Sequence, residues 1–376
     1  MKQLINYLNT YGNYDFGEEP FNDIDNLIFS QLVYTDFEGI LDMQSSLFLC
    51  DAAIKFYALN DEKDIDKLIG ISEKSARLLY ECSKTKRFAY VRLSRYINNV
   101  NEEIDKQFAA INFELSKESL VVAFRGTDVT VTGVKESAML SYMFPVPAQI
   151  QALYYFQESA MLHKGEIRIL GHSKGGNLAV FAGVSCSNSL KKRIVEIYED
   201  DAPGFPKWFF ERYDYLQIKD KIRLITPQTS IVGRMLYHDE KPVIIESANS
   251  GLRQHQVSSW EIDGTTLKPA EKYDSMSDFI SDYINTLIDY IGDDDLQLFF
   301  DTIEYVAENM GIDDFYDIKT VDIKRIFRLI DSLSILDEAQ KERFKIILKK
   351  ASADFAKEYF SIRKNEYIEK YIKPKS

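Results

Sequence analysis

The chain has 376 residues, of which 45% are apolar and 28% charged, and its formal net charge at pH 7 is −13. This length and composition fit one main domain with an appendage and exclude a disordered or fibrous chain. The negative charge repels phosphate backbones and anionic membrane surfaces, so we expect no nucleic-acid partner.

The cysteines and the distribution of apolar residues bear on disulfide or metal binding and on cellular location. Cys50, Cys82 and Cys186 are widely spaced and lack CxxC or His-rich neighbours, which indicates buried thiols rather than disulfides or a zinc site. The first residues contain no continuous apolar segment, and no run of eighteen apolar residues occurs anywhere. We therefore expect a cytoplasmic protein of bacterial type, without an export signal or a transmembrane segment.

The N-terminal segment, residues 1–88, is predicted to be mainly helical and to pack on the core. One helix is expected to begin at Asn22 or Asp23 and to continue through Val33. Another is expected to begin at Asp64 and to continue through Leu79. Both follow from helical spacing of apolar residues after a capping side chain.

Residues 89–268 alternate between strand and helix patterns, and residues 269–376 are predicted to form a C-terminal helical region. Strands are predicted at 108–115, 119–126, 167–170, 194–198, 222–226, 243–246 and 259–262, and helices at 146–163, 177–184 and 206–215. Residues 119–126 are apolar on both faces, which is typical of the middle of a sheet that helices cover on each side. We predict an α/β fold with a mostly parallel sheet and helices on both of its faces.

The segment Gly171-His172-Ser173-Lys174-Gly175 places a G-x-S-x-G motif between a predicted strand and a predicted apolar helix. Glycines at 171 and 175 remove side chains where the strand turns sharply into the helix, so that a strained Ser173 presents its hydroxyl above the sheet edge. The backbone N–H of Lys174 and the helix dipole would then face a developing oxyanion. A structural glycine turn is the alternative, and a Walker phosphate loop does not fit because the order here is Ser-Lys-Gly.

A second oxyanion donor is expected in the turn after the strand at 119–126. Gly126 permits close approach of the backbone, Thr127 offers its N–H, and Arg125 is expected to anchor the loop through carboxylates. The alternative is a plain strand-ending turn.

Two motifs together resemble the class 3, fungal-type lipases of the α/β-hydrolase superfamily and an uncharacterised bacterial branch similar to them. They are VVAFRGTD at 121–128 and GHSKGG at 171–176, and DAPGF at 201–205 with Gln-His at 254–255 resembles the bacterial branch further. The resemblance covers about residues 90–262. It implies that the serine attacks an ester and that the threonine after Arg-Gly contributes to the oxyanion hole.

The chain departs from that family in two places. Class 3 lipases usually have Leu where this chain has Lys174, and they carry their catalytic acid in the segment after the next strand. Here that segment, TPQTS at 226–230, has no carboxylate. The position of the acid is therefore in question.

The general base is predicted by elimination among four histidines. His163 and His172 precede Ser173, whereas the expected chain order is serine, acid, histidine. His172 is expected to point to the opposite face of its strand, in a structural role. His238 lies in an irregular stretch and is expected at the surface, which leaves the loop-borne His255 as the base.

The acid has three candidates. Asp200 and Asp201 follow the strand at 194–198, at the carboxyl edge of the sheet, where the active sites of α/β proteins usually lie. Asp239 is the third and least favoured candidate. Neighbouring residues leaving a strand point in opposite directions, so only one of the first two can face the histidine. Asp201 is preferred because it lies nearer the Pro-Gly turn, and because the resemblance has a recurring Asp two places before Pro-Gly.

The predicted chemistry is acyl transfer from a small-molecule ester through a Ser173-His255-Asp201 triad, with no metal and no organic cofactor. A thioesterase or acyltransferase would use the same residues, and a non-catalytic binding protein on the same fold is the alternative from another class. Apolar residues within 129–150 and aromatic residues of the C-terminal helices are expected to be packed core rather than a lid. The sequence does not define the oligomeric state.

Overall fold

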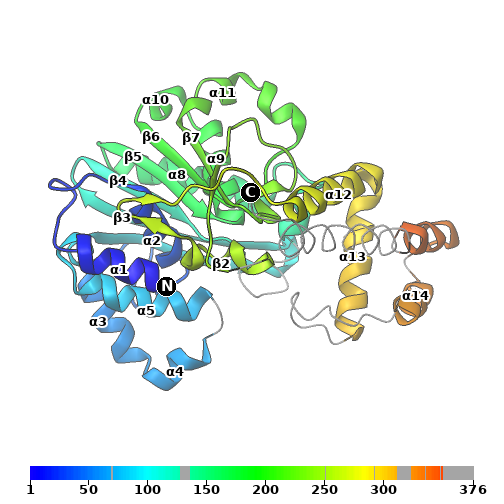
Figure 1. Ribbon diagram of the computed structural model, residues 1–376, viewed down its shortest axis with the longest axis horizontal. Coiled ribbons are helices and arrows are strands. Elements are labelled where there is room, and N and C mark those ends of the chain that lie inside the picture. The colour runs from blue at the N-terminus through cyan, green and yellow to red at the C-terminus, as the bar shows by residue number, and fades with distance from the viewer. Residues whose placement is uncertain are drawn as a thin grey trace, which may run out of the picture. The chain divides into compact units, whose positions relative to one another are not determined.

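The structure is a computed structural model of the chain (Figure 1), and it describes residues 1–68, 71–127, 136–249, 251–291, 293–310, 323–334, 336–347 and 349. The chain divides into two compact units, Met1–Ser277 and Asp278–Ser376. The domain limits expected from the sequence, 1–88, 89–268 and 269–376, stay predictions.

The first unit is built on an eight-stranded sheet in which the strands lie in the order of the chain, β1 to β8. They are β1 (Ser46–Phe48), β2 (Arg92–Asn101), β3 (Lys106–Ser116), β4 (Ser119–Phe124), β5 (Glu166–His172), β6 (Ile194–Asp200), β7 (Ile222–Pro227) and β8 (Val243–Ile245). Strands β1 to β4 pair antiparallel, and β4 to β8 pair parallel. The predicted α/β fold with a mostly parallel sheet is confirmed.

Alternate residues of the central strands face two separate hydrophobic clusters. In β4, Val121 and Ala123 belong to the cluster of the N-terminal helices, whereas Leu120, Val122 and Phe124 belong to the cluster on the other face. This two-sided burial explains the continuous apolar run in the sequence.

Helices cover both faces of this sheet (Figure 1). On the first face lie α1 (Lys2–Tyr11), α2 (Asp23–Leu32), α3 (Leu49–Leu59), α5 (Ile71–Ser83) and the short α6 (Lys86–Ala89), and on the other lie α8 (Pro147–Leu162), α9 (Lys174–Ser185) and α11 (Tyr213–Leu216). Among the described residues of this unit, further short helices are α4 (Glu62–Lys67), α10 (Asn188–Lys191) and the 3-10 turns η1 (Glu102–Ile104), η2 (Lys207–Glu211), η3 (Lys219–Lys221), η4 (Val232–Arg234), η5 (Gly251–His255) and η6 (Val257–Ser259). Residues 136–139 are helical as well.

The N-terminal predictions are confirmed in part. Asn22 caps α2 in a reciprocal capping box with Asp25, as the helix predicted at this position requires. The helix predicted from Asp64 to Leu79 is wrong, because Asp61 caps α4, which ends before Leu68, and α5 follows as a separate helix. The extended backbone of Leu68 interrupts the periodic apolar pattern that suggested one helix.

One strand was missed, and one predicted strand needs correction. β2 was missed, because a register shift between Ser94 and Ile97, with Arg95 at φ 55°, breaks the alternation that marks a strand. Residues 259–262 do not finish the main sheet. Instead, β9 (Ile262–Asp263) pairs with β10 (Thr266–Leu267) in a separate two-stranded sheet.

Most apolar residues between the oxyanion turn and α8 are packed, as expected, whereas Met143 is exposed. Met139, Leu140 and Val146 form a small buried cluster with Tyr142 and Leu236 against it. Residues 128–135 of the same stretch lie outside the described residues.

The described part of the C-terminal region is mainly helical. α12 (Ser275–Ile291) starts at the end of the first unit, and α13 (Asp293–Met310) and α14 (Ile323–Ser332) follow. Within the second unit Phe299 is buried and packs against Phe300 and Phe344. No helix among the described residues is both long and apolar enough to span a membrane.

Candidate active site

Ser173 occupies a sharp turn between β5 and α9. Its backbone has φ 59° and ψ −135°, a strained conformation for a residue with a side chain. A Cβ at Gly171 would lie 2.3 Å from the Gly175 carbonyl carbon, and one at Gly175 would lie 2.2 Å from the Phe124 carbonyl oxygen. Only glycine fits at both positions, so the two glycines permit the strand-turn-helix geometry that the motif predicted.

The end of β4 lies directly against this turn. A Cβ at Gly126 would lie 2.5 Å from the His172 carbonyl oxygen and 3.1 Å from Cβ of Ser173. The next residue, Thr127, is half-buried, and its hydroxyl contacts the hydroxyl of Ser137. The structure thus places the predicted oxyanion loop and Ser173 side by side.

Asp201 and His255 meet at the same edge of the sheet. Nδ1 of His255, in η5, lies 2.7 Å from Oδ2 of Asp201, which directly follows β6. The other carboxylate oxygen of Asp201 accepts hydrogen bonds from the Ser230 hydroxyl and from the Gly233 N–H, the latter at 3.1 Å. With Nδ1–H donated to this fixed carboxylate, the lone pair of the imidazole lies on Nε2.

His172 connects His255 to the turn that carries Ser173. The rings of His172 and His255 have centroids 4.3 Å apart, and Nε2 of His172 lies 2.6 Å from the backbone oxygen of His255. Among the described residues no hydrogen bond joins the Ser173 hydroxyl to the His255 imidazole.

A buried tyrosine extends this connection to the oxyanion loop. The hydroxyl of Tyr34 lies 3.3 Å from Nδ1 of His172 and accepts the N–H of Gly126 at 3.1 Å. Burial lowers the pKa of His172 well below its usual value, with a smaller contribution from His255. A neutral His172 can donate from Nε2 to the backbone oxygen of His255 and accept at Nδ1 from the hydroxyl of Tyr34, so both of its ring nitrogens have a partner.

The two adjacent aspartates face different partners, as the strand geometry predicts. Asp200 is fully buried and accepts hydrogen bonds from Asn26 and Ser30 of α2. Burial raises the pKa of Asp200 to about 7, although these hydrogen bonds oppose the shift. Asp239 is exposed and contacts the Tyr215 hydroxyl and Lys219, so among the three candidates only Asp201 contacts His255.

The side chain of Lys174 is buried, a feature that sequence reasoning missed. Its ammonium lies 2.7 Å from Oε2 of Glu136 and donates to the backbone and side-chain oxygens of Gln107 at 2.8 and 2.7 Å. Glu136 also accepts the backbone N–H groups of Gln107 and Ala148, at 3.0 and 2.9 Å. The residue after Ser173 is thereby tied to β3 and to the segment that precedes α8.

The predicted surface position of His238 is wrong. Its side chain is 11% exposed, and its Nδ1 lies 3.5 Å from Oε1 of the buried Glu199. The error arose because the irregular stretch that carries His238 folds back onto β6 and the segment after it. His238 meets Glu199 of β6 there, and Tyr237 bridges to Phe205 in the segment that follows the strand.

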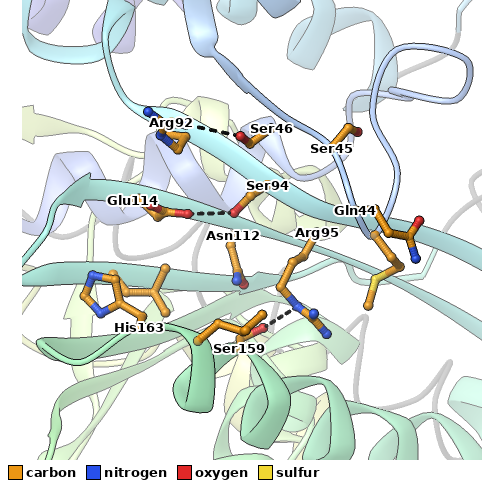
Figure 2. Close-up of a pocket in the computed structure, with 13 residues that line it drawn as sticks. Gln44, Ser45, Ser46, Arg92, Ser94, Arg95, Asn112, Glu114, Ser159 and His163 are labelled. Atoms are coloured by element: carbon orange, nitrogen blue, oxygen red, sulfur yellow. Dashed lines mark hydrogen bonds between the residues drawn. The ribbon is translucent and has the colours of Figure 1, made fainter.

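A separate cavity of about 320 Å³ lies beside β2 and β3 (Figure 2). Within it Ser94 donates to Glu114 at 3.0 Å, and Arg95 donates to Ser159 at 3.2 Å. Its lining contains none of the residues that meet at the edge near Ser173. This cavity is therefore distinct from the candidate active site.

Residues 82–304 match the family model described as Mbeg1-like. The chain belongs to the Mbeg1-like family. No curated protein matches the sequence significantly.

Solved structures similar to this Mbeg1-like chain include lipases of fungi and yeast. One is a fungal lipase (12% identity, covering 72% of this chain and 88% of that chain, TM-score 0.38). Others are an MDLA mutant from Penicillium cyclopium (11% identity, 67% and 87%, TM-score 0.37) and the Lip2 lipase from Yarrowia lipolytica (16% identity, 44% and 68%, TM-score 0.31).

Three residues of the site were not found from the sequence: Tyr34, Glu136 and Ser230. Of these three, only Ser230 could have been found from the sequence. It lies in the segment where the resemblance to class 3 lipases places the acid and where this chain has no carboxylate. Its hydroxyl bonds to Asp201, which arrives from the neighbouring strand.

Proposed function

We propose that this Mbeg1-like chain is a serine hydrolase that cleaves carboxylic esters through an acyl-enzyme on Ser173. The observation that carries the proposal is the 2.7 Å contact between His255 Nδ1 and Asp201, at the sheet edge that also bears the strained Ser173 turn. An imidazole oriented by a carboxylate, at the same sheet edge as a serine nucleophile, is the arrangement that acyl transfer requires.

In the proposed reaction Nε2 of His255 takes the proton of the Ser173 hydroxyl as the oxygen attacks the ester carbonyl. The imidazolium that forms is stabilised by Asp201. The backbone N–H groups of Thr127 and Lys174 hold the tetrahedral oxyanion, with the N-terminus of α9 adding a favourable dipole. His255 returns the proton to the leaving alcohol, and water then hydrolyses the acyl-enzyme in the same way.

The resemblance of the motifs at 121–128 and 171–176 to class 3 lipases supports an ester substrate with an acyl chain. A thioesterase or an acyltransferase would use the same groups. These differ in leaving group or acceptor, so a comparison of matched substrates separates them.

A fluorophosphonate probe tests the proposal directly. We expect one covalent adduct on Ser173, located by mass spectrometry, and its loss in Ser173→Ala. Labelling should be much slower in His255→Ala, because the unactivated hydroxyl reacts slowly. Hydrolysis of p-nitrophenyl esters and of thioesters with equal acyl chains, by wild type and Ser173→Ala, then identifies the substrate class.

The competing function is a non-catalytic binding protein on the same fold. A correctly folded wild-type chain that forms no adduct on Ser173, or that labels equally fast as His255→Ala, would favour it and remove the hydrolase proposal.

A further inference from the structure

Three potential metal ligands converge behind the carboxyl end of β6. They are Glu199 near the end of that strand and His238 with Glu240 from the stretch between η4 and β8. One ligand atom from each lies within 4.8 Å of the other two. None of them is part of the proposed triad.

Glu199 is buried with one carboxylate oxygen that lacks a hydrogen bond. Its side chain is 1% exposed, and its Oε1 makes no hydrogen bond although it points into the cluster, 3.5 Å from Nδ1 of His238. The His238 imidazole, itself a member of the cluster, is the charged group beside this oxygen. A buried carboxylate is costly unless it is well paired or bound to a metal. Nε2 of His238 is likewise buried without a hydrogen bond.

We propose that Glu199, His238 and Glu240 bind a divalent first-row transition-metal ion. One imidazole with two carboxylates is a ligand set of intermediate softness, suited to Zn²⁺ or Mn²⁺ rather than to Mg²⁺ or Ca²⁺. Two ligands at ordinary zinc distances in a tetrahedral site lie about 3.4 Å apart. The separation of 3.5 Å between Nδ1 and Oε1 matches that spacing and is long for a hydrogen bond.

The ligands are held in place by the surrounding structure. Tyr237 pairs with Phe205 in an isolated bridge, which fixes the backbone beside His238. The buried Tyr215 donates its hydroxyl to Oε1 of Glu240 at 2.8 Å. Such outer contacts orient metal ligands, and little reorganisation is needed to close the site around an ion.

By binding Glu199 of β6 together with His238 and Glu240, the ion would hold the segment between η4 and β8 against β6. That stretch begins next to Gly233, whose N–H bonds to Asp201. We therefore assign the metal a structural task near the acid of the proposed triad, without contact with the reacting atoms. The metal-free alternative is an imidazolium at His238 that offsets one of the two carboxylate charges.

Isothermal titration of the chelator-treated full chain with Zn²⁺ and Mn²⁺ tests the site. We expect saturable binding of one ion per chain and a higher melting temperature, with Mg²⁺ and Ca²⁺ binding far more weakly. Glu199→Gln, His238→Ala and Glu240→Gln should each lower the affinity by at least about tenfold. Asp239→Asn and His163→Ala, an exposed neighbour and a remote histidine, should bind as wild type.

Circular dichroism establishes that each variant is folded, and if Glu199→Gln unfolds, the less buried Glu240→Gln decides. Absence of saturable binding, equal affinity in the ligand variants, or a preference for Mg²⁺ or Ca²⁺ would overturn the proposal. The same titration of Ser173→Ala separates this inference from the hydrolase proposal, because binding there should be unchanged whether or not Ser173 is a nucleophile.

Discussion

Asp200 and Asp201 are neighbours in the sequence with unlike surroundings. Asp200 accepts hydrogen bonds from α2, beneath the sheet edge, whereas Asp201 adopts φ 46° and turns its carboxylate to His255. The positive φ of Asp201 is strained for a non-glycine residue. Its contacts with Ser230 and Gly233 hold it there, and they leave Oδ2 for the imidazole.

Replacing Asp201 with Asn should lower turnover by about 10⁴, because an amide favours the wrong imidazole tautomer while keeping the shape. Steady-state hydrolysis of the best ester, with melting temperature as the folding check, measures the effect. Asp239→Asn is the matched control and should retain full activity. An inactive Asp200→Asn beside an active Asp201→Asn would contradict the assignment.

At the scale of elements, the buried pair of Lys174 and Glu136 joins α9 to the segment before α8. Both side chains are at most 1% exposed, and their separation is 2.7 Å. Breaking such a pair leaves one charge buried without its partner, which typically costs about 3–5 kcal/mol.

We therefore expect Lys174→Met and Glu136→Gln each to lower the free energy of unfolding by about that amount. The double variant should lose less than the sum, because neither residue then leaves a buried charge. Urea unfolding measures all three, and Lys219→Met, which breaks an exposed pair with Asp239, should cost at most about 1 kcal/mol. Strict additivity of the two single changes would show that the pair is not coupled.

The buried carboxyl of Asp200, which accepts hydrogen bonds from α2, makes the free energy of unfolding depend on pH. Burial raises the pKa of its carboxyl from an ordinary value of 3.8 to about 7 in the folded chain. Since the folded state binds the proton more tightly, this group favours folding below about pH 4, and that contribution is lost as the pH rises through about 7.

The free energy of unfolding should thus fall between about pH 4 and 7 by up to about 1.4 kcal/mol per pH unit from this group. The difference between wild type and Asp200→Asn in urea unfolding isolates it, and the variant should have the shallower pH dependence. Asp239→Asn should leave the dependence unchanged. Equal slopes in wild type and Asp200→Asn would contradict the role of Asp200.

Local sequence patterns predicted the elements that lie in the middle of the fold and missed those at its margin. The apolar run of β4 follows from burial on both faces of the sheet, and the glycines beside Ser173 follow from the sharp turn there. The turn at Ser173 and the neighbouring loop after β4 were therefore predictable from local sequence. β2 was not, because its irregular register hides the alternation. The helix expected from Asp64 failed because a periodic apolar pattern does not reveal a short break.

For the whole molecule, the remaining contacts of the candidate site depend on tertiary folding. Tyr34 reaches His172, and Glu136 reaches Lys174, across long stretches of chain that no local pattern encodes. The surface position predicted for His238 was wrong for the same reason, since its loop meets Glu199 of β6 only in the folded chain. Chain order and strand direction, together with the resemblance at the Asp before Pro-Gly, nevertheless predicted the Asp201–His255 contact. Both residues follow elements that end at one edge of the sheet.

The last residues of the first unit contact the segment that holds Asp201 in place. All residues of the candidate site lie within Met1–Ser277, whose last residues also contact the turn beside Asp201. The Asp274 carboxylate accepts the Thr229 hydroxyl, and the Ser277 hydroxyl donates to the backbone oxygen of Ser230. A chain that ends after Ser277 keeps these contacts, whereas one that ends at Lys272 loses them.

We expect the chain of residues 1–277 to fold and to react with a fluorophosphonate at the full-length rate. The chain of residues 1–272 should melt at a lower temperature and react more slowly, because Ser230 is held less firmly against Asp201. Calorimetry and labelling kinetics on the two truncations and the full chain provide the comparison. Identical behaviour of the two truncations would show that residues 273–277 do not support the site, and failure of residues 1–277 to fold would show that the first unit depends on the second.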